Sequence, residues 1–158
     1  MAEMTKTMKL HIRPDEECAA LLKELTVKYS RACNYVSEYV FDHGFILNFM
    51  ELQKALYNDV RRECGLKSQF TISSLKTVTA RYKTIRTQLA KKPYKYQNGN
   101  GDWRFIPRTL EWLTKPVSFR RPQADLVRGR DYSFVNGASG EKLLSLNTLG
   151  GRIKVTFD

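Results

Sequence analysis

The residues with the clearest chemical potential in this sequence are its arginines and lysines, which are concentrated in one internal block. Residues 76–130 contain 14 Lys and Arg side chains and only three acids, whereas residues 1–75 contain ten of each sign and residues 131–158 three of each sign. One block therefore carries the whole net charge of +11. A positive field of this density attracts phosphate groups and displaces the counterions condensed on them. The charge pattern predicts that this block binds nucleic acid.

The first cations of the block are expected on one face of a helix. Lys76 and Lys83 are seven residues apart, which is two helical turns, and Arg86 follows three residues later. Such a row can follow a phosphate backbone, although helix surfaces also carry Lys and Arg for solvation alone. Arginine suits bidentate contacts with phosphate because its guanidinium is planar. The other expected backbone contacts are Lys91, Lys92, Arg104, Arg108, Arg120, Arg121, Arg128 and Arg130.

Aromatic rings alternate with these charges at Tyr94, Tyr96 and Trp103. Rings between cations are the mixture found where unpaired bases stack on a protein, so these three are candidate base-stacking residues. Packing between a helical bundle and a sheet explains Trp103 equally well and Trp112 better.

The sequence contains no recognisable catalytic or metal-binding motif. It lacks G-x-x-x-x-G-K-[ST] and G-x-S-x-G, and its carboxylates are interleaved with Lys and Arg as on solvated helix surfaces. Cys18, Cys33 and Cys64 are widely spaced and only His11 and His43 could join them, so no zinc site is expected. We expect the thiols to act as small apolar residues. We expect no catalytic residue, metal or cofactor in this chain.

Three amphipathic segments predict the helices that position the cations. Steps of three and four residues between apolar positions indicate a first helix that follows Asp15 as N-cap and ends near Asp42–Gly44. They indicate a second helix that begins after Asn48 and is terminated by Gly65. A third is expected to start after Thr71 or Ser73. Three such helices joined by short loops can bury one another as a bundle.

Alternating apolar and polar residues predict strands at both ends of the chain. Strands need lateral partners, so the first is expected to pair with the late ones. Residues 93–116 are expected to be partly ordered, with a short helix at 107–114. The expected strands are Thr7–Arg13, Val117–Arg120, Tyr132–Val135, Leu143–Leu146 and Arg152–Phe157.

These elements together predict an α+β fold. We expect a small β-barrel built from residues 1–14 and 93–158, interrupted after its first strand by a helical bundle over residues 15–92.

Four short segments in a fixed order are spread over nearly the whole length of the chain: Thr5–Pro14, Tyr29–Asn34, Pro116–Arg121 and Leu146–Val155. They are a strand that ends in proline, an aromatic-to-asparagine stretch of the first helix, a Pro-x-x-Phe-Arg-Arg segment and a Leu…Gly-x-Arg-Ile-Lys-Val strand. The series resembles the N-terminal region of the TnpB (OrfB) family of transposon-encoded RNA-guided nucleases, relatives of the type V CRISPR effectors. Residues 93–115 match that family poorly.

The resemblance implies a wedge β-barrel of OB-like type and a helical recognition domain. In the family these parts hold a guide RNA and its heteroduplex with target DNA, and help to read a short motif in the DNA duplex. The resemblance implies motif contacts from Phe49, Gln53, Gln69, Ser73 and Asn136, for which loop and cap roles are the alternative.

The resemblance also implies what this chain lacks. The family's nuclease domain, with its carboxylate triad, divalent metal and Cys-x-x-Cys zinc element, would begin where this sequence stops. We therefore expect either a deliberately shortened piece or a naturally truncated gene product, which does not cleave by itself. A full-length parent would be a metal-dependent RNA-guided DNA endonuclease of a prokaryotic mobile element.

Two other functions remain open at this point: a generic basic RNA- or DNA-binding protein, and a protein-interaction adaptor with an acidic partner. The sequence has no run of 18 apolar residues and no secretory signal. We therefore expect a cytoplasmic protein, either free or associated with the nucleoid, and no membrane partner.

Overall fold

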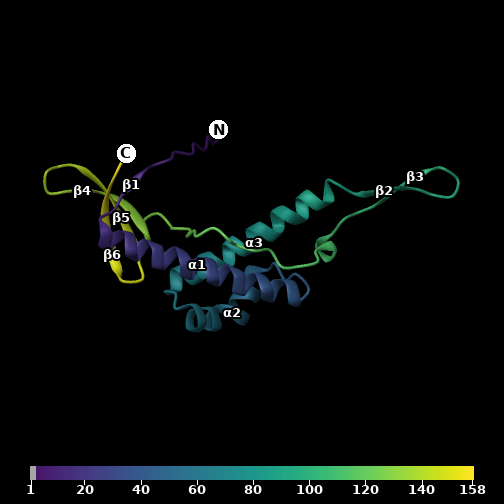
Figure 1. Cartoon of the computed structure of the whole chain (residues 1–158), viewed down its shortest axis with the longest axis horizontal. Coiled ribbons are helices and arrows are strands. Elements are labelled where there is room, and N and C mark those ends of the chain that lie inside the picture. Colours follow the sequence, from purple (N-terminus) through teal and green to yellow (C-terminus); the bar gives the residue numbers. More distant parts are fainter. Residues whose placement is uncertain (1–2) are drawn as a thin grey trace. The chain divides into compact units, whose positions relative to one another are not determined.

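The computed structural model describes residues 3–158, which fold as a mixed α+β chain of three helices, one 3₁₀ turn and an antiparallel sheet accompanied by a separate hairpin (Figure 1). The chain divides into two compact units. The β unit contains the described residues up to Leu25 together with Leu126–Asp158, and the helical unit is Thr26–Asp125. The elements are β1 (Ile12–Arg13), α1 (Glu16–Asp42), α2 (Phe49–Cys64), α3 (Ser68–Ala90), β2 (Tyr94–Gln97), β3 (Trp103–Ile106), η1 (Leu110–Trp112), β4 (Tyr132–Asn136), β5 (Lys142–Thr148) and β6 (Gly151–Phe157).

The β unit is a four-stranded antiparallel sheet in the order β1-β6-β5-β4. Alternate residues of β5 and β6 point to one face, where Leu144, Leu146, Ile153 and Val155 form the core against the first turns of α1. The turn between β5 and β6 packs closely on α1 at Gly150, because a Cβ there would lie 2.8 Å from a methyl carbon of Leu21, which would have to shift. The expected strands at 132–135, 143–146 and 152–157 are confirmed.

The first strand is much shorter than the expected Thr7–Arg13. It pairs with β6 as predicted, but only Ile12 and Arg13 belong to the ladder, opposite Phe157 and Thr156. Residues 3–10 have no partner strand within the described part of the chain, so their alternating pattern has no face to bury. The side chain of Met8 is accordingly 71% exposed.

The helical unit is organised by α1, α2 and α3, and its core contains Tyr29, Phe70 and Tyr82. The helix ends follow the sequence signals. The side chain of Asn48 accepts hydrogen bonds from the backbone N–H groups of Met50 and Glu51, and α2 ends at Gly65 in the left-handed conformation.

The third helix begins at Ser68, earlier than the expected start after Thr71 or Ser73. These two residues are buried inside the helix instead of capping it. The hydroxyl of Thr71 donates back to the carbonyl of Lys67, at 3.1 Å, which satisfies it within the first turn.

Residues 93–125 belong to the helical unit, whereas the sequence analysis assigned them to the β-domain. Val117–Arg120 forms no strand, because its backbone hydrogen bonds go to side chains of the bundle. The expected helix at 107–114 is reduced to the 3₁₀ turn η1, which packs on α3. The β2–β3 hairpin, which the sequence analysis did not predict, extends from the end of α3 (Figure 1). No helix within residues 3–158 is long and apolar enough to cross a membrane.

Candidate nucleic-acid interface

Side chains on one face of α1 hold the segment that carries Arg120 and Arg121. Ser30, Asn34 and Ser37 follow one another at steps of four and three residues, so they line a single face of the helix. Asn34 forms two hydrogen bonds with the backbone of Phe119: its Nδ2 donates to the carbonyl at 3.1 Å and its Oδ1 accepts from the N–H at 2.7 Å. A side-chain amide thus pairs with the segment much as a neighbouring strand would.

The two serines extend this pairing in both directions. Ser37 Oγ donates to the carbonyl of Val117 at 2.6 Å. Ser30 Oγ donates to the carbonyl of Arg121 at 3.1 Å and accepts from the N–H of Gln123 at 3.2 Å. Alternate backbone groups from 117 to 123 are therefore bound to α1, and the side chains of Arg120 and Arg121 are left exposed on a fixed backbone.

The end of the segment is anchored by hydroxyl groups. Asp125 Oδ2 accepts hydrogen bonds from Thr77 on α3 and, at 3.4 Å, from the hydroxyl of Tyr29 on α1. The oxygens of Tyr29 and Thr77 also lie 2.8 Å apart, so the two hydroxyl protons are shared among the two hydroxyls and the carboxylate. Burial raises the pKa of Tyr29 well above its ordinary value, so this hydroxyl keeps its proton. Asp125 is therefore occupied by two donors from the helices.

A groove of about 610 Å³ lies between α3 and this segment. Three arginines contribute to its wall, Arg81 from α3 and Arg120 and Arg121 from the segment. None of the three forms an ion pair or a side-chain hydrogen bond within residues 3–158. The groove is lined by Thr77, Ala80, Arg81, Thr84, Ser118, Phe119, Arg120, Arg121, Gln123 and Asp125.

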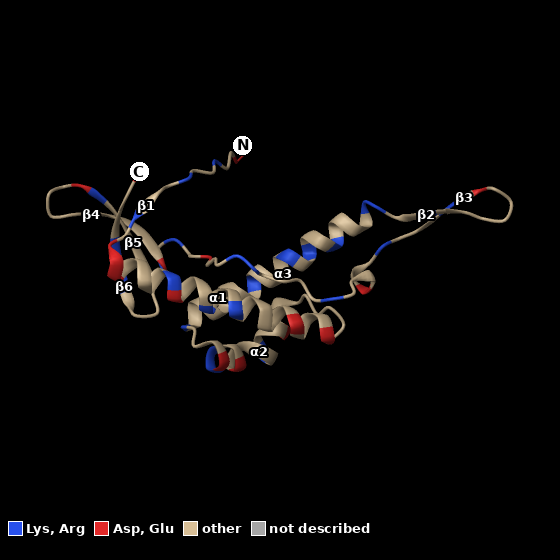
Figure 2. Cartoon of the chain, in the orientation of Figure 1, with Lys and Arg blue, Asp and Glu red and all other residues tan. Residues whose placement is uncertain are grey.

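The neighbouring side of α3 carries the lysines of the expected row. Lys76 and Lys83 line a smaller hollow of about 310 Å³ together with Phe49, and the Lys76 ammonium lies 5.3 Å from the centre of the Phe49 ring. Ala80 contributes to this hollow and to the arginine groove, so cations border α3 on both sides of that small residue. The helix has no acidic residue, as Figure 2 shows.

Arg86 does not share the hollow of Lys76 and Lys83. It lines a separate cavity of about 410 Å³ with Arg108, near the C-terminal end of α3. The Arg108 guanidinium lies 5.7 Å from the ring centre of Trp112, and its buried Nε has no hydrogen-bond partner among the described residues. The expected single row is thus divided between two places.

The β2–β3 hairpin carries the aromatic candidates at the end of α3. Its register pairs Tyr96 with Arg104 and Gln97 with Trp103. Because directly opposed residues share a face, Tyr94 and Tyr96 lie on one face and Trp103 lies on the other. The three candidates therefore do not form one stacking surface. Instead, Tyr94 contacts Tyr96 and Trp112, with ring centres 6.3 and 6.1 Å apart.

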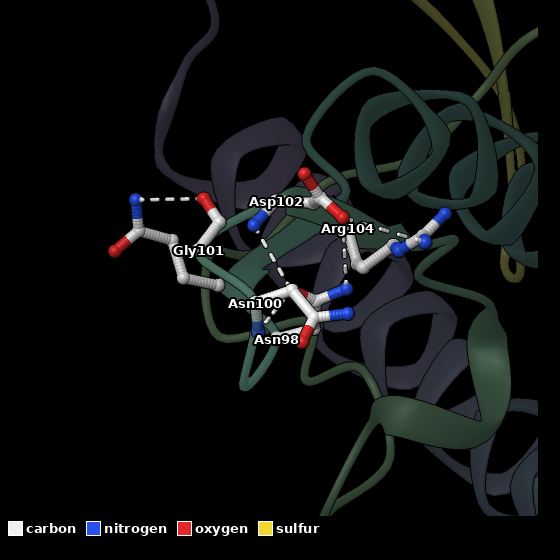
Figure 3. A network of polar contacts seen from close by, with 6 residues as sticks. Asn98, Asn100, Gly101, Asp102 and Arg104 are labelled. Atoms are coloured by element: carbon white, nitrogen blue, oxygen red, sulfur yellow. Dashed lines mark hydrogen bonds and ion pairs between the residues drawn. The ribbon is translucent and has the colours of Figure 1, made fainter.

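The turn of the hairpin is fixed by one asparagine (Figure 3). Asn98 Oδ1 accepts hydrogen bonds from the backbone N–H groups of Asn100, at 3.0 Å, and Asp102, at 2.9 Å. Gly101 adopts a positive φ of 82°, which favours glycine. Arg104 lies 4.0 Å from the Asp102 carboxylate in an exposed pair.

The remaining expected contacts are dispersed. Gln53 is half-buried on α2, Gln69 is half-buried in the first turn of α3, and Lys91 and Lys92 are exposed beyond its end. Ser73 is only 5% exposed, so a role in touching duplex DNA does not agree with the structure.

Three of the expected residues belong to the β unit. Asn136 is exposed at the end of β4 and accepts a hydrogen bond from Lys142 at 2.7 Å. Arg128 and Arg130 lie in the turn before β4, which the buried Asp131 stabilises by accepting from the N–H of Val127 at 2.9 Å.

Sequence reasoning missed Arg81 and the role of Trp112. Arg81 lies four residues after Thr77 and three before Thr84, so the helical period placed it on their face. What no local pattern revealed was that the segment 118–125 would lie opposite.

Comparison with protein-family models, with curated proteins and with solved structures gave no match for this chain. Within residues 3–158, no three His, Cys, Asp or Glu side chains are grouped so that they could hold a metal ion. The function is therefore inferred from the residues and their geometry.

Proposed function

We propose that this chain is a nucleic-acid-binding module, and that the groove between α3 and residues 118–125 binds a phosphate backbone. The observation that carries the proposal is that three arginines of that groove, Arg81, Arg120 and Arg121, form no ion pair or side-chain hydrogen bond within residues 3–158. Guanidinium groups without carboxylate partners leave their donors available to phosphate oxygens. The α1 side chains hold the backbone of the segment before any ligand arrives, which lowers the ordering cost of binding.

We infer, more specifically, that the ligand is a guide RNA with its target-DNA heteroduplex, as the resemblance to the TnpB family implies. Two of the four resembling segments support this because they contact each other: Asn34, in the aromatic-to-asparagine stretch, pairs with Phe119, in the Pro-x-x-Phe-Arg-Arg segment. On this proposal the β1-β6-β5-β4 sheet is part of a wedge barrel, and sequence selection is left to base pairing. Cleavage would require the metal-dependent nuclease domain of a longer parent.

The groove is tested by replacing Arg120 and Arg121 together with alanine in the full chain. Removing two phosphate-binding side chains should weaken binding to a structured RNA about a hundredfold or more, since hydrogen bonds to charged groups contribute roughly 1.5–3 kcal/mol each. The slope of log K against log salt should fall by about 0.7–0.9 for each phosphate that is no longer neutralised. Fluorescence anisotropy over a salt series measures both quantities.

The chain offers a matched control in Arg61 and Arg62, an exposed pair of adjacent arginines on α2. Their double alanine variant removes the same charge from a surface outside the groove and should leave the salt slope unchanged. Equal effects of the two variants would mean that net charge, and not the groove, governs binding.

The identity of the nucleic acid is tested by sequencing RNA that copurifies with the chain from its native host. A single abundant noncoding RNA that ends in variable sequence supports a guide. Bulk ribosomal RNA would instead indicate a generic basic RNA-binding protein. Retention of an acidic protein without any polynucleotide would indicate an adaptor.

A further inference from the structure

The β2–β3 hairpin exposes several large aromatic side chains to solvent. Every residue of β2 and β3 is exposed, including Trp103 at 61%, Phe105 at 57% and Tyr94 at 45%. An isolated hairpin has marginal stability in water, and grouped exposed rings mark binding surfaces. The hairpin therefore has the composition of an arm that is covered by a ligand.

One face of this arm continues as a row of three rings. Tyr96 and Tyr94 share a face of β2, and Trp112 of η1 continues the row beyond Tyr94, with ring centres 6.3 and 6.1 Å apart. All three rings remain between 40% and 45% exposed. Each therefore has free surface on which a planar group can stack.

The same face carries arginines. Arg104 is directly opposite Tyr96 in the register, and Arg108 lies over Trp112 at 5.7 Å. Arg108 also lines the cavity of about 410 Å³ that contains Arg86, and its Nε is buried without a partner in the described part of the chain. A guanidinium nitrogen without a partner, on a residue that lines a cavity together with a second arginine, favours an anionic ligand there.

The opposite face of the arm has a different character. Trp103 and Phe105 project there, and the Lys95 ammonium lies 5.6 Å from the centre of the Phe105 ring. This face has two rings and one ammonium group, whereas the tyrosine face has a row of three rings with the guanidinium groups of Arg104 and Arg108 beside it. The tyrosine face is therefore the better candidate for a ligand that combines flat apolar rings with regularly spaced negative charge.

We propose that the tyrosine face of the hairpin binds unpaired nucleotides, with bases stacked on Tyr96, Tyr94 and Trp112 and a phosphate held between Arg86 and Arg108. This inference deepens the proposed nucleic-acid function and rests on it. It assigns single-stranded nucleic acid to the arm and leaves duplex backbone to the arginine groove of α3. The Asn98-centred turn in Figure 3 fixes the strand pairing, so the rings are placed before the ligand binds.

The test uses the full chain and two fluorescent probes, an oligouridine of about 12 nucleotides, within the range that single-strand-binding folds cover, and an RNA duplex of similar length. The double variant Tyr94→Leu with Tyr96→Leu removes the rings and keeps apolar side chains. It should weaken oligouridine binding by roughly fivefold to a hundredfold per ring and leave duplex affinity unchanged. The Tyr94→Phe with Tyr96→Phe variant keeps the rings and should bind like the parent.

The matched control is on the other face of the same hairpin. Trp103→Leu with Phe105→Leu removes as many rings, so it reports any general damage to the ribbon, and it should leave oligouridine affinity unchanged. The proposal is overturned if this control loses as much affinity as the tyrosine variant, or if the tyrosine variant binds oligouridine like the parent. The latter outcome would leave another protein as the occupant of the arm.

The phosphate position and the dependence on the proposed function are tested separately. Arg86→Ala should weaken oligouridine binding and its salt dependence, and an unchanged salt slope would remove the Arg86 and Arg108 cavity from the proposal. If Arg120→Ala with Arg121→Ala weakens duplex binding while the tyrosine variant has no effect on oligouridine binding, the inference about the hairpin is wrong and the proposed function of the groove stands. If the tyrosine variant weakens oligouridine binding but the double arginine variant leaves duplex binding unchanged, the proposed role of the arginine groove is wrong.

Discussion

At the scale of single residues, Asn34 is the side chain on which the arginine groove depends most. Its amide donates a hydrogen bond to the backbone of Phe119 and accepts another from it. Ser30 and Ser37, the other α1 residues that hold the segment, do not form two hydrogen bonds with one residue of it. Replacing it by alanine leaves two partly buried backbone groups without partners. We expect the variant to lose about 1–3 kcal/mol of unfolding free energy. Urea denaturation followed by circular dichroism measures this loss.

The Asn34→Ala variant should also bind RNA more weakly, because Arg120 and Arg121 would no longer be carried on a fixed backbone. Asn58 is a suitable control, since it is an exposed asparagine on α2. Its alanine variant should be unchanged in both measurements. If Asn34→Ala is destabilised but binds RNA like the parent, the segment does not need to be held in place for binding.

The cysteines give a second prediction at this scale. Burial, with a smaller contribution from the negative charge of Asp125, raises the pKa of Cys33 to about 12, and burial also raises that of Cys64. Thiolate is the reactive form, so at pH 8 both thiols should resist alkylation in the native protein. The hydrogen bond with Asp15 raises the pKa of Cys18 as well, but this thiol is only half-buried and should be labelled first because the reagent can reach it. Mass spectrometry after iodoacetamide treatment gives the order, and early labelling of Cys33 would contradict the buried packing of α1.

At the scale of the elements, the sequence was informative where the determinants are local. Helix α2 begins after Asn48 and ends before Gly65 as expected, because capping is determined by residues within one helical turn. The structure of Val117–Arg120 could not be predicted from local sequence. Apolar and polar residues alternate in this segment as in a strand. Its hydrogen-bond partners, however, are side chains of α1 more than 80 residues earlier, which no local pattern predicts.

The hairpin, by contrast, had a local signal that the sequence analysis did not use. Aromatic residues stand at every second position in 94–97 and again in 103–106, on either side of a turn that contains Asn98 and Gly101. The residues of the candidate site also differ in whether local sequence could identify them. Arg120 and Arg121 were found from charge alone, whereas Arg81 required knowledge of what lies opposite α3.

The N-terminus of α1 gives a prediction for one element. Asp15 Oδ1 accepts from the backbone N–H of Cys18 at 2.8 Å, and this hydrogen bond lowers the pKa of Asp15 below its ordinary 3.8. A lowered folded-state pKa means that the cap stabilises the fold above about pH 3.8 and that this stability is lost as the pH falls through the folded-state pKa. Thermal unfolding between pH 2 and pH 6 should show the loss.

Two substitutions isolate this contribution. Asp15→Asn keeps an oxygen acceptor for the N–H of Cys18 but does not titrate, so it should remove part of the pH dependence with little loss of stability at neutral pH. Asp15→Ala should lower the melting temperature at neutral pH. A parent and an Asp15→Asn variant with identical pH profiles would show that the cap makes no titrating contribution.

At the scale of the whole molecule, the distribution of charge is the property that connects the fold with the proposed function. The excess cations of residues 76–130 fall on α3, on the hairpin, on the extended segment of the helical unit and, through Arg128 and Arg130, on the turn before β4 of the β unit. Figure 2 shows both signs of charge on α1 and α2 and only positive charge on α3. A ligand bound through its phosphates should therefore protect one part of the sequence and leave another open.

Lysine acetylation in the presence and absence of RNA, read by mass spectrometry, tests this over the entire chain. We expect bound RNA to reduce the acetylation of Lys76 and Lys83 on α3, because a bound phosphate shields an ammonium from the reagent, and to leave Lys95 unchanged, since it lies on the Trp103 and Phe105 face of the hairpin. Lys9 and Lys54 are exposed lysines outside the block and serve as internal references. Since all five are modified in one sample, differences in protein quality cancel. Uniform protection of all lysines would mean that RNA is held by the overall charge of the molecule, and the groove and the arm would then lose their basis together.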